Sequence, residues 1–126
     1  ALIGEGVAYL PPVEHPELLS LLYLATALVN SSVAEGMCGS LLEAMALRVP
    51  ILARAVPGNL ELVRHGSTGL LFTTPAEAVQ QAKDLARQSD LRKSLTDRGL
   101  LYLNMHHSVE RERDVLVEAL SHLERQ

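Results

Sequence analysis

The sequence predicts an α/β fold in which helices flank a parallel sheet and a helical tail follows at the C-terminal end. Four short apolar runs lack polar alternation and are bounded by Pro, Gly, Ser or Asn, which is typical of strands buried on both faces of a parallel sheet. Helical segments separate these runs, and this alternation favours right-handed βαβ crossovers. We therefore expect one domain, with an α/β part at residues 1–74 and a helical part at residues 75–126.

The four predicted strands occupy residues 6–10, 27–30, 50–54 and 69–72. Their brevity and their lack of polar alternation are what place them in the interior of the sheet.

Three helices are expected between the strands. The first begins at Pro16, a residue suited to the first turn of a helix, and the second covers residues 40–47. The third covers residues 60–65, with His65 in its last turn and Gly66 placed to cap it.

The tail is expected to hold three further helices. Residues 76–87 form an amphipathic segment and residues 90–102 a second one, while Ser108 is the predicted N-cap of the last helix. The apolar stripe of that last helix consists of Val109, Leu116, Leu120 and Leu123. Because such a stripe has to be covered, the tail is expected to pack on the sheet or on a partner domain.

Composition limits the possible functions. The 126 residues are 48% hydrophobic and 21% charged, as in a soluble globular domain, and the formal charge of −4 disfavours nucleic acid and anionic membranes as partners. Cys38 is the only cysteine, so no internal disulfide is expected. No apolar run approaches the roughly 18 residues of a membrane span, and the first residues lack the basic start of a signal peptide. We expect a cytoplasmic piece of a longer protein.

The loop from Ser31 to Gly39 is the most informative segment, because it joins a predicted strand directly to a helix. In open α/β sheets, ligands bind beyond the carboxyl ends of the strands, and a helix N-terminus there presents free N–H groups to an anion. Gly36 and Gly39 would let a ligand approach the backbone closely. The segment predicts an anion or nucleotide site, although the G-x-G-x-x-G spacing of dinucleotide-binding loops is missing.

Two carboxylates, Glu35 and Glu43, frame this loop at E-x7-E spacing. Carboxylates are strong acceptors for sugar or ribose hydroxyls. Helical periodicity by itself favours a simpler interpretation, in which Glu43 lies off the apolar stripe and faces water.

The string SSVAEGMCGSLLEAMALRVPIL, followed by NLELVRHGSTGLLF, resembles the C-terminal domain of retaining GT-B glycosyltransferases of the group 1 (family 4) type. That family carries a pattern close to S-x-x-E-G-F-G-x-P-x-L-E-A-M-A-x-G-x-P-V. The resemblance covers nearly the whole chain, from GVAYLPPV at the start to HSVE near the end. It implies a Rossmann-like half of a GT-B fold and a nucleotide-diphosphate sugar as the donor.

The resemblance also implies a role for each matching residue. Glu35 would lie at the donor sugar as the catalytic residue, and Glu43 would bind the nucleotide ribose. Donor sugar and diphosphate would be bound by Gly36, Met37, Cys38, Gly39, Ser40 and Leu41. The base would be bordered by Leu10, Pro11, Pro12 and Val13. No metal and no cofactor are expected, because the helix dipole and basic residues would stabilise the diphosphate leaving group.

The sequence departs from the family pattern in several places. Met37 and Cys38 replace a Phe-Gly pair, Ser40 replaces Pro, and Arg48 replaces the Gly before Val-Pro. The basic pair that clamps the diphosphate and the acceptor-binding N-terminal domain lie upstream in this family. We therefore expect a missing partner domain, no turnover by this chain alone, and an apolar wall that favours self-association.

Two alternatives remain open at this stage: a GT-B nucleotide-sugar epimerase, and a non-catalytic domain that kept the fold for binding. Among single residues, Cys38 is either a reactive thiol near a helix N-terminus or a packed loop residue, and the second is favoured. His15 lies near the presumed base loop without an assigned role. The pair of His106 and His107 lacks neighbours at metal-ligand spacing, which disfavours a metal site.

Overall fold

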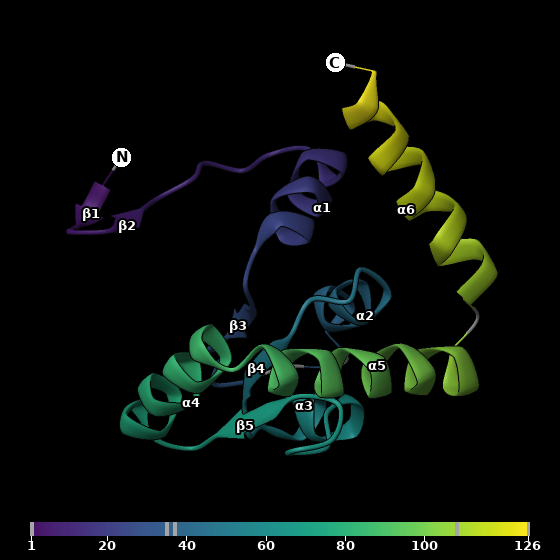
Figure 1. Ribbon diagram of the computed structural model, residues 1–126. Coiled ribbons are helices and arrows are strands. Elements are labelled where there is room, and N and C mark those ends of the chain that lie inside the picture. Colours follow the sequence, from purple (N-terminus) through teal and green to yellow (C-terminus); the bar gives the residue numbers. More distant parts are fainter. Residues whose placement is uncertain (1, 35, 37, 108, 126) are drawn as a thin grey trace.

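The computed structural model describes residues 2–34, 36, 38–107 and 109–125, and its centre is a three-stranded parallel sheet (Figure 1). The strand order is β3-β4-β5, with β3 at Leu28–Asn30, β4 at Ile51–Arg54 and β5 at Leu70–Phe72. Leu28 pairs with Ile51, and Leu52 pairs with Leu70. Three of the four predicted strands are therefore confirmed.

Strand β4 is buried on both faces, and its alternation divides the core in two. Ile51 and Ala53 belong to a cluster with helix α2, whereas Leu52 points to the other face and packs with Leu70 and Phe72. Because both faces are covered, an apolar run without polar alternation is what this strand requires.

The predicted strand at residues 6–10 is present only in part, and its predicted place in the parallel sheet is wrong. Val7–Ala8 forms β2, which pairs antiparallel with β1 (Leu2–Gly4) in a hairpin that projects away from the sheet (Figure 1). Gly6 has φ of 78°, a backbone conformation that glycine adopts freely and that lets the chain reverse. A short apolar run does not by itself distinguish an inner strand from a hairpin strand.

The helices between the strands are α1 (His15–Leu24), α2 (Gly39–Ala46) and α3 (Pro57–Leu62). The third helix begins and ends three residues earlier than predicted, because Pro57 occupies its first turn.

As a result, His65 is outside α3, contrary to the prediction. Its Nδ1 accepts a hydrogen bond of 2.9 Å from the Leu71 backbone N–H. The backbone of His65 also forms an isolated parallel β-bridge with Gly69. Gly66, with φ of 77°, lies in the turn before β5 and does not cap α3.

Helix α2 ends in a Schellman-type turn. The Val49 N–H donates to the Ala44 carbonyl at 2.8 Å, and the Arg48 N–H donates to the Met45 carbonyl at 3.3 Å. Arg48 has φ of 58°, in the left-handed region that glycine adopts without strain, and its guanidinium pairs with Asp97. This is the position where the family pattern has glycine.

The tail consists of α4 (Pro75–Arg87), α5 (Ser89–His106) and α6 (Val109–Glu124). Helix α5 packs along α2, and α6 returns to lie beside α1 (Figure 1). The tail is therefore part of the same packed body as the sheet. The predicted cap at residue 108 lies outside the described residues.

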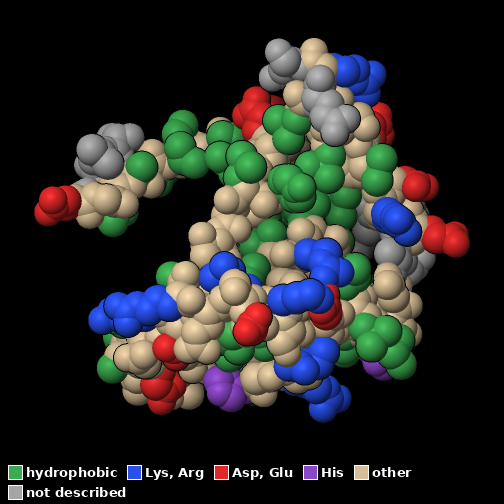
Figure 2. Space-filling model, viewed as in Figure 1, with side chains coloured by type: hydrophobic (Ala, Val, Ile, Leu, Met, Phe, Trp, Pro, Cys, Tyr) green, Lys and Arg blue, Asp and Glu red, His purple; other side chains and the backbone are tan. Residues whose placement is uncertain are grey.

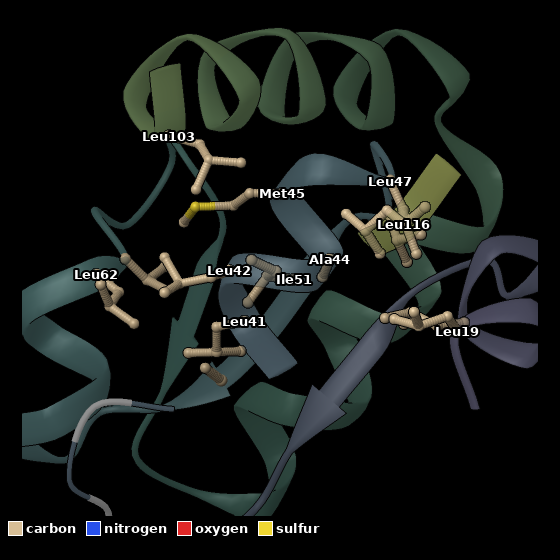
Figure 3. Close-up of a cluster of buried hydrophobic side chains, with 14 of the residues drawn as sticks. Leu19, Leu41, Leu42, Ala44, Met45, Leu47, Ile51, Leu62, Leu103 and Leu116 are labelled. Carbon is tan, nitrogen blue, oxygen red and sulfur yellow. The ribbon is translucent and has the colours of Figure 1, made fainter. Parts of the chain in front are cut away.

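The larger core cluster joins the tail to the α/β part. It contains side chains from α1, α2, β4, α3, α5 and α6, many of which appear in Figure 3. Leu19 of α1 and Leu116 of α6 are both buried there, so the predicted stripe of the last helix does face the core at Leu116. Within the described residues, no helix combines the length and apolar character needed to cross a membrane.

Candidate functional site

The predicted ligand loop lies where parallel sheets bind ligands. Strand β3 ends at Asn30 and α2 begins at Gly39, so the connecting loop leaves the sheet at its carboxyl edge. Two of the predicted site residues, Glu35 and Met37, lie outside the described residues. The other members of the predicted set can be placed one by one.

The side chain of Asn30 holds both ends of the loop. Its Oδ1 accepts a hydrogen bond of 3.2 Å from the Ser32 backbone N–H, and its Nδ2 donates to Cys38 Sγ at 3.4 Å. Asparagine side chains commonly bond to backbone two residues ahead in this way. One residue at the end of β3 therefore sets the span of the loop.

A second asparagine, Asn59, holds the side chain of Asn30 in place. Asn59 of α3 is fully buried, and its Nδ2 donates to Asn30 Oδ1 at 3.3 Å and to the Arg54 carbonyl at 3.0 Å. Buried polar groups need such partners, so this network ties β3, β4 and α3 together beneath the loop. Neither asparagine was predicted as part of the site, because Asn30 ends a predicted strand, Asn59 precedes the predicted helix at residues 60–65, and only tertiary packing brings the two together.

Arg54 adds a cation at the same edge. Its Nε donates to the Ser31 carbonyl at 2.9 Å, and its guanidinium lies 5.5 Å from the centre of the Phe72 ring. The contact with Ser31 anchors the first residue of the loop. Arg54 was not among the predicted site residues.

The N-terminus of α2 has no side-chain cap. Cys38 is the N-cap residue, with φ of −87° and ψ of 109°, and its side chain makes no capping hydrogen bond. The first-turn N–H groups of such a helix are suited to an anion. A Cβ built on Gly36 or Gly39 would meet no heavy atom within 4 Å, so there is open space beside both.

Cys38, Ser40 and Leu41 differ in what they offer a ligand. Cys38 is half-buried, and its Sγ lies 3.0 Å from Ser40 Oγ, which favours the interpretation of a packed loop residue. The Leu41 side chain is fully buried in the core. Leu41 can therefore contact a ligand through its backbone only.

Glu43 does not simply face water. Its Oε1 lies 2.7 Å from His15 Nε2, and the Glu43 side chain is 26% exposed against 51% for that of His15. Glu43 is therefore partly exposed, as the simpler interpretation expects, and in addition has a side-chain partner. His15, which had no assigned role, is brought from the start of α1 onto the expected ribose ligand.

The predicted base-side residues form an extended, exposed segment that leads into α1. Leu10, Pro11, Pro12 and Val13 are all in this segment. Val13 also lines a groove of about 570 Å³ between α1 and α6, with Leu21, Leu24 and Leu123. Figure 2 shows hydrophobic side chains gathered between these two helices.

No group of three or more His, Cys, Asp or Glu side chains within the described ranges could hold a metal ion. The histidine pair near the end of α5 has another environment, because the rings of His106 and His107 lie 4.7 Å and 5.9 Å from the Tyr102 ring.

Comparison with known proteins gives concordant matches. The family model "Glycosyl transferases group 1" matches residues 1–100. "Glycosyltransferase 1 domain-containing protein 1" of Xenopus tropicalis is 43% identical over 110 residues, which are 87% of this chain and 32% of that relative. "D-inositol 3-phosphate glycosyltransferase 1" of Catenulispora acidiphila is 36% identical over 95 residues, which are 75% of this chain and 21% of that relative.

Solved structures also match the fold of this chain. The crystal structure of Anabaena Alr3699/HepE in complex with UDP-glucose superposes with a TM-score of 0.61 at 25% identity. This match covers 80% of this chain and 29% of that one. A second structure of the same protein, with UDP and glucose, gives a TM-score of 0.62 at the same identity. The chain thus spans between 21% and 32% of the length of these proteins.

Proposed function

This chain belongs to the family of group 1 glycosyl transferases, and we propose that it binds the nucleotide-diphosphate sugar from which its enzyme transfers a sugar. Its α/β fold is the C-terminal, Rossmann-like half of a GT-B fold with a helical tail, as predicted. One observation carries the proposal: the uncapped N-terminus of α2 opens beside free space at the carboxyl edge of the sheet. The UDP-glucose complex of Anabaena Alr3699/HepE supports it.

In this proposal, each part of the donor meets a different part of the loop and helix. The diphosphate lies at the backbone of Gly39, Ser40 and Leu41, and Glu43 accepts hydrogen bonds from ribose hydroxyls. The sugar lies against residues 35–38, with Glu35 as the catalytic residue. The base lies beside residues 10–13.

The proposed reaction is transfer of a glycosyl group from the nucleotide diphosphate to an acceptor hydroxyl. The bond between the anomeric carbon and the diphosphate oxygen breaks, and a bond from that carbon to an acceptor hydroxyl oxygen forms with retention of configuration. The acceptor hydroxyl proton passes to the leaving diphosphate. The N–H groups and dipole of α2 stabilise the negative charge that develops on that diphosphate.

A second domain completes the proposed enzyme. The chain covers 32% of the Xenopus relative, and we propose that the remainder supplies the acceptor site and a basic clamp for the diphosphate. On this basis the chain alone binds donor without turnover, and its location in the cytoplasm stays a prediction.

Calorimetric titration of the full-length protein with UDP-glucose and with GDP-sugars tests the proposal. We expect the protein to bind either the UDP-sugar or the GDP-sugars. Glu43→Ala should lower that affinity about tenfold or more, since hydrogen bonds to charged groups contribute roughly 1.5–3 kcal/mol. Glu17→Ala, an exposed acid on α1, serves as the matched control and is expected to bind normally. Failure of the intact protein to bind any nucleotide sugar would refute the transferase proposal.

A non-catalytic binding domain is the second candidate, because Cys38 and Arg48 replace two glycines of the family pattern. Product analysis separates the possibilities. Transfer of the sugar supports the transferase, isomerised free sugar nucleotide supports an epimerase, and tight binding without either product supports the non-catalytic domain.

A further inference from the structure

We propose that His15 is a positioning residue for Glu43, which it orients toward the ribose hydroxyls of the donor. The inference rests on the proposed function, because it concerns how the ribose ligand is held. His15 belongs to α1, whereas Glu43 belongs to α2. The inference is based on the 2.7 Å contact between His15 Nε2 and Glu43 Oε1.

The position of His15 is set by the core. His15 is the first residue of α1, Pro16 occupies the first turn, and Leu19 is fully buried one turn later. Residues four apart lie on the same face of a helix, so burial of Leu19 turns His15 toward the packed side of α1. His15 and Leu19 also line one small cavity of about 170 Å³.

The backbone of Glu43 is equally fixed, but its carboxylate is not. Leu42 and Ala44 on either side are buried in the core, and the Glu43 carbonyl accepts the Leu47 N–H at 3.0 Å. A glutamate side chain retains several rotatable bonds even when its backbone is rigid. The imidazole of His15 removes that freedom by binding Oε1.

The contact leaves the carboxylate able to bind a ligand. A carboxylate offers about four lone-pair sites on two oxygens, so engagement of Oε1 by His15 leaves Oε2 to accept a ribose hydroxyl. Preorganised groups bind more tightly than mobile ones, because less ordering is needed on binding.

The contact between His15 and Glu43 is expected to contribute little to the stability of the fold. Ion pairs and hydrogen bonds between partly exposed side chains contribute little to folding, and His15 is half-exposed. Glu118 and His122 of α6 line the same small cavity as His15. The effect we infer is therefore on ligand geometry.

The test compares two probes on the full-length protein: UDP, and 2′,3′-dideoxy-UDP, which lacks the ribose hydroxyls. GDP and its dideoxy form replace them if GDP binds more tightly. The unmodified protein is expected to prefer the hydroxylated nucleotide by about tenfold or more. In His15→Ala this preference should fall at least about threefold, while affinity for the dideoxy nucleotide stays unchanged.

Two variants sharpen the result. His15→Gln keeps an N–H donor at this position and should restore part of the preference. His106→Ala, an exposed histidine at the end of α5, should leave both affinities unchanged.

The outcomes are distinguishable. If His15→Ala weakens both nucleotides equally, His15 has a structural role only and the inference is overturned. If Glu43→Ala abolishes the preference and His15→Ala does not, the inference also fails, while the proposed ribose role of Glu43 stands. If the unmodified protein binds neither nucleotide, the proposed function and this inference fail together.

Discussion

The two ends of helix α2 are built in opposite ways. The C-terminal end is closed by the Schellman-type turn at Ala44 and Val49 and is packed under α5. The N-terminal end has no side-chain cap and opens beside Gly39 into free space. One short helix thus separates stability from binding: its last turn packs into the core, and its first turn remains available to an anion.

Removing a core side chain near the closed end should have the largest effect. Met45 is buried between α2 and α5, and Met45→Ala should lower the free energy of unfolding by about 2–5 kcal/mol through lost contacts and a residual cavity. Chemical denaturation measures this. Leu24→Ala, at a position 79% exposed, should change it by less than about 0.5 kcal/mol. Equal losses for both variants would contradict the packing described for α2.

A negative charge at the open end should separate binding from stability most clearly. Gly39→Asp places a carboxylate beside the first turn, which should raise stability by about 0.3–1 kcal/mol through the helix dipole. The same charge should repel the diphosphate and reduce nucleotide affinity by about tenfold or more. Melting curves and calorimetry on one preparation measure both effects.

The neutral control is Gly39→Ala, which the open space accommodates. It should keep most of the affinity. If Gly39→Asp binds nucleotide as well as Gly39→Ala does, the diphosphate does not lie at this helix end.

Glycine at the closed end should be a small improvement. Arg48→Gly relieves the left-handed φ of 58°, worth roughly 1 kcal/mol, and removes an exposed pair with Asp97 worth roughly 0–1 kcal/mol. We expect a net gain of up to about 1 kcal/mol and unchanged nucleotide affinity. Arg48→Ala loses the pair without relieving the backbone, so it should be less stable than Arg48→Gly. The reverse order would show that the ion pair outweighs the strain.

The N-terminus of α4 supplies the smallest test, because it is capped where that of α2 is not. Thr74 Oγ1 accepts the Glu77 N–H at 3.2 Å, and Glu77 Oε2 accepts the Thr73 N–H at 2.8 Å. The latter bond, with that from the Thr73 hydroxyl, lowers the pKa of Glu77 below its ordinary value. The stabilisation from Glu77 is therefore present above the pKa of the unfolded chain and is lost as pH falls through the lower folded pKa.

Glu77→Gln should accordingly be slightly less stable than the unmodified protein at neutral pH. The two stability curves should converge in acid, below the folded pKa of Glu77. A difference that stays constant down to low pH would mean that the charge on Glu77 contributes nothing to the cap.

Elements were predictable from the sequence where the local pattern and the tertiary packing agree. Residues 50–53 are an apolar run that ends at Arg54, and both faces of β4 are buried at Ile51, Leu52 and Ala53. Residues 6–10 carry a similar run, yet they form part of an exposed hairpin, because strand position depends on which neighbours the chain finds. Local pattern contains no information about such neighbours.

The candidate site likewise has a part that was predictable from the sequence and a part that was not. The loop between β3 and α2 was predictable, because strand, turn and helix are contiguous in the sequence. The contact of His15 with Glu43 joins residues 28 positions apart, and the contact of Asn59 with Asn30 joins residues 29 apart. Such pairs depend on tertiary packing, so residue types and spacing within one segment could not reveal them.

A crystal structure of the full-length protein with UDP bound tests most directly whether the N-terminus of α2 holds the donor diphosphate. We predict that the diphosphate contacts the backbone N–H groups of Gly39 and Ser40, and that the ribose hydroxyls bind Glu43 while His15 still holds its other oxygen. UDP bound away from the N-terminus of α2, with Glu43 contacting His15 alone, would show that this helix end and Glu43 do not bind the donor.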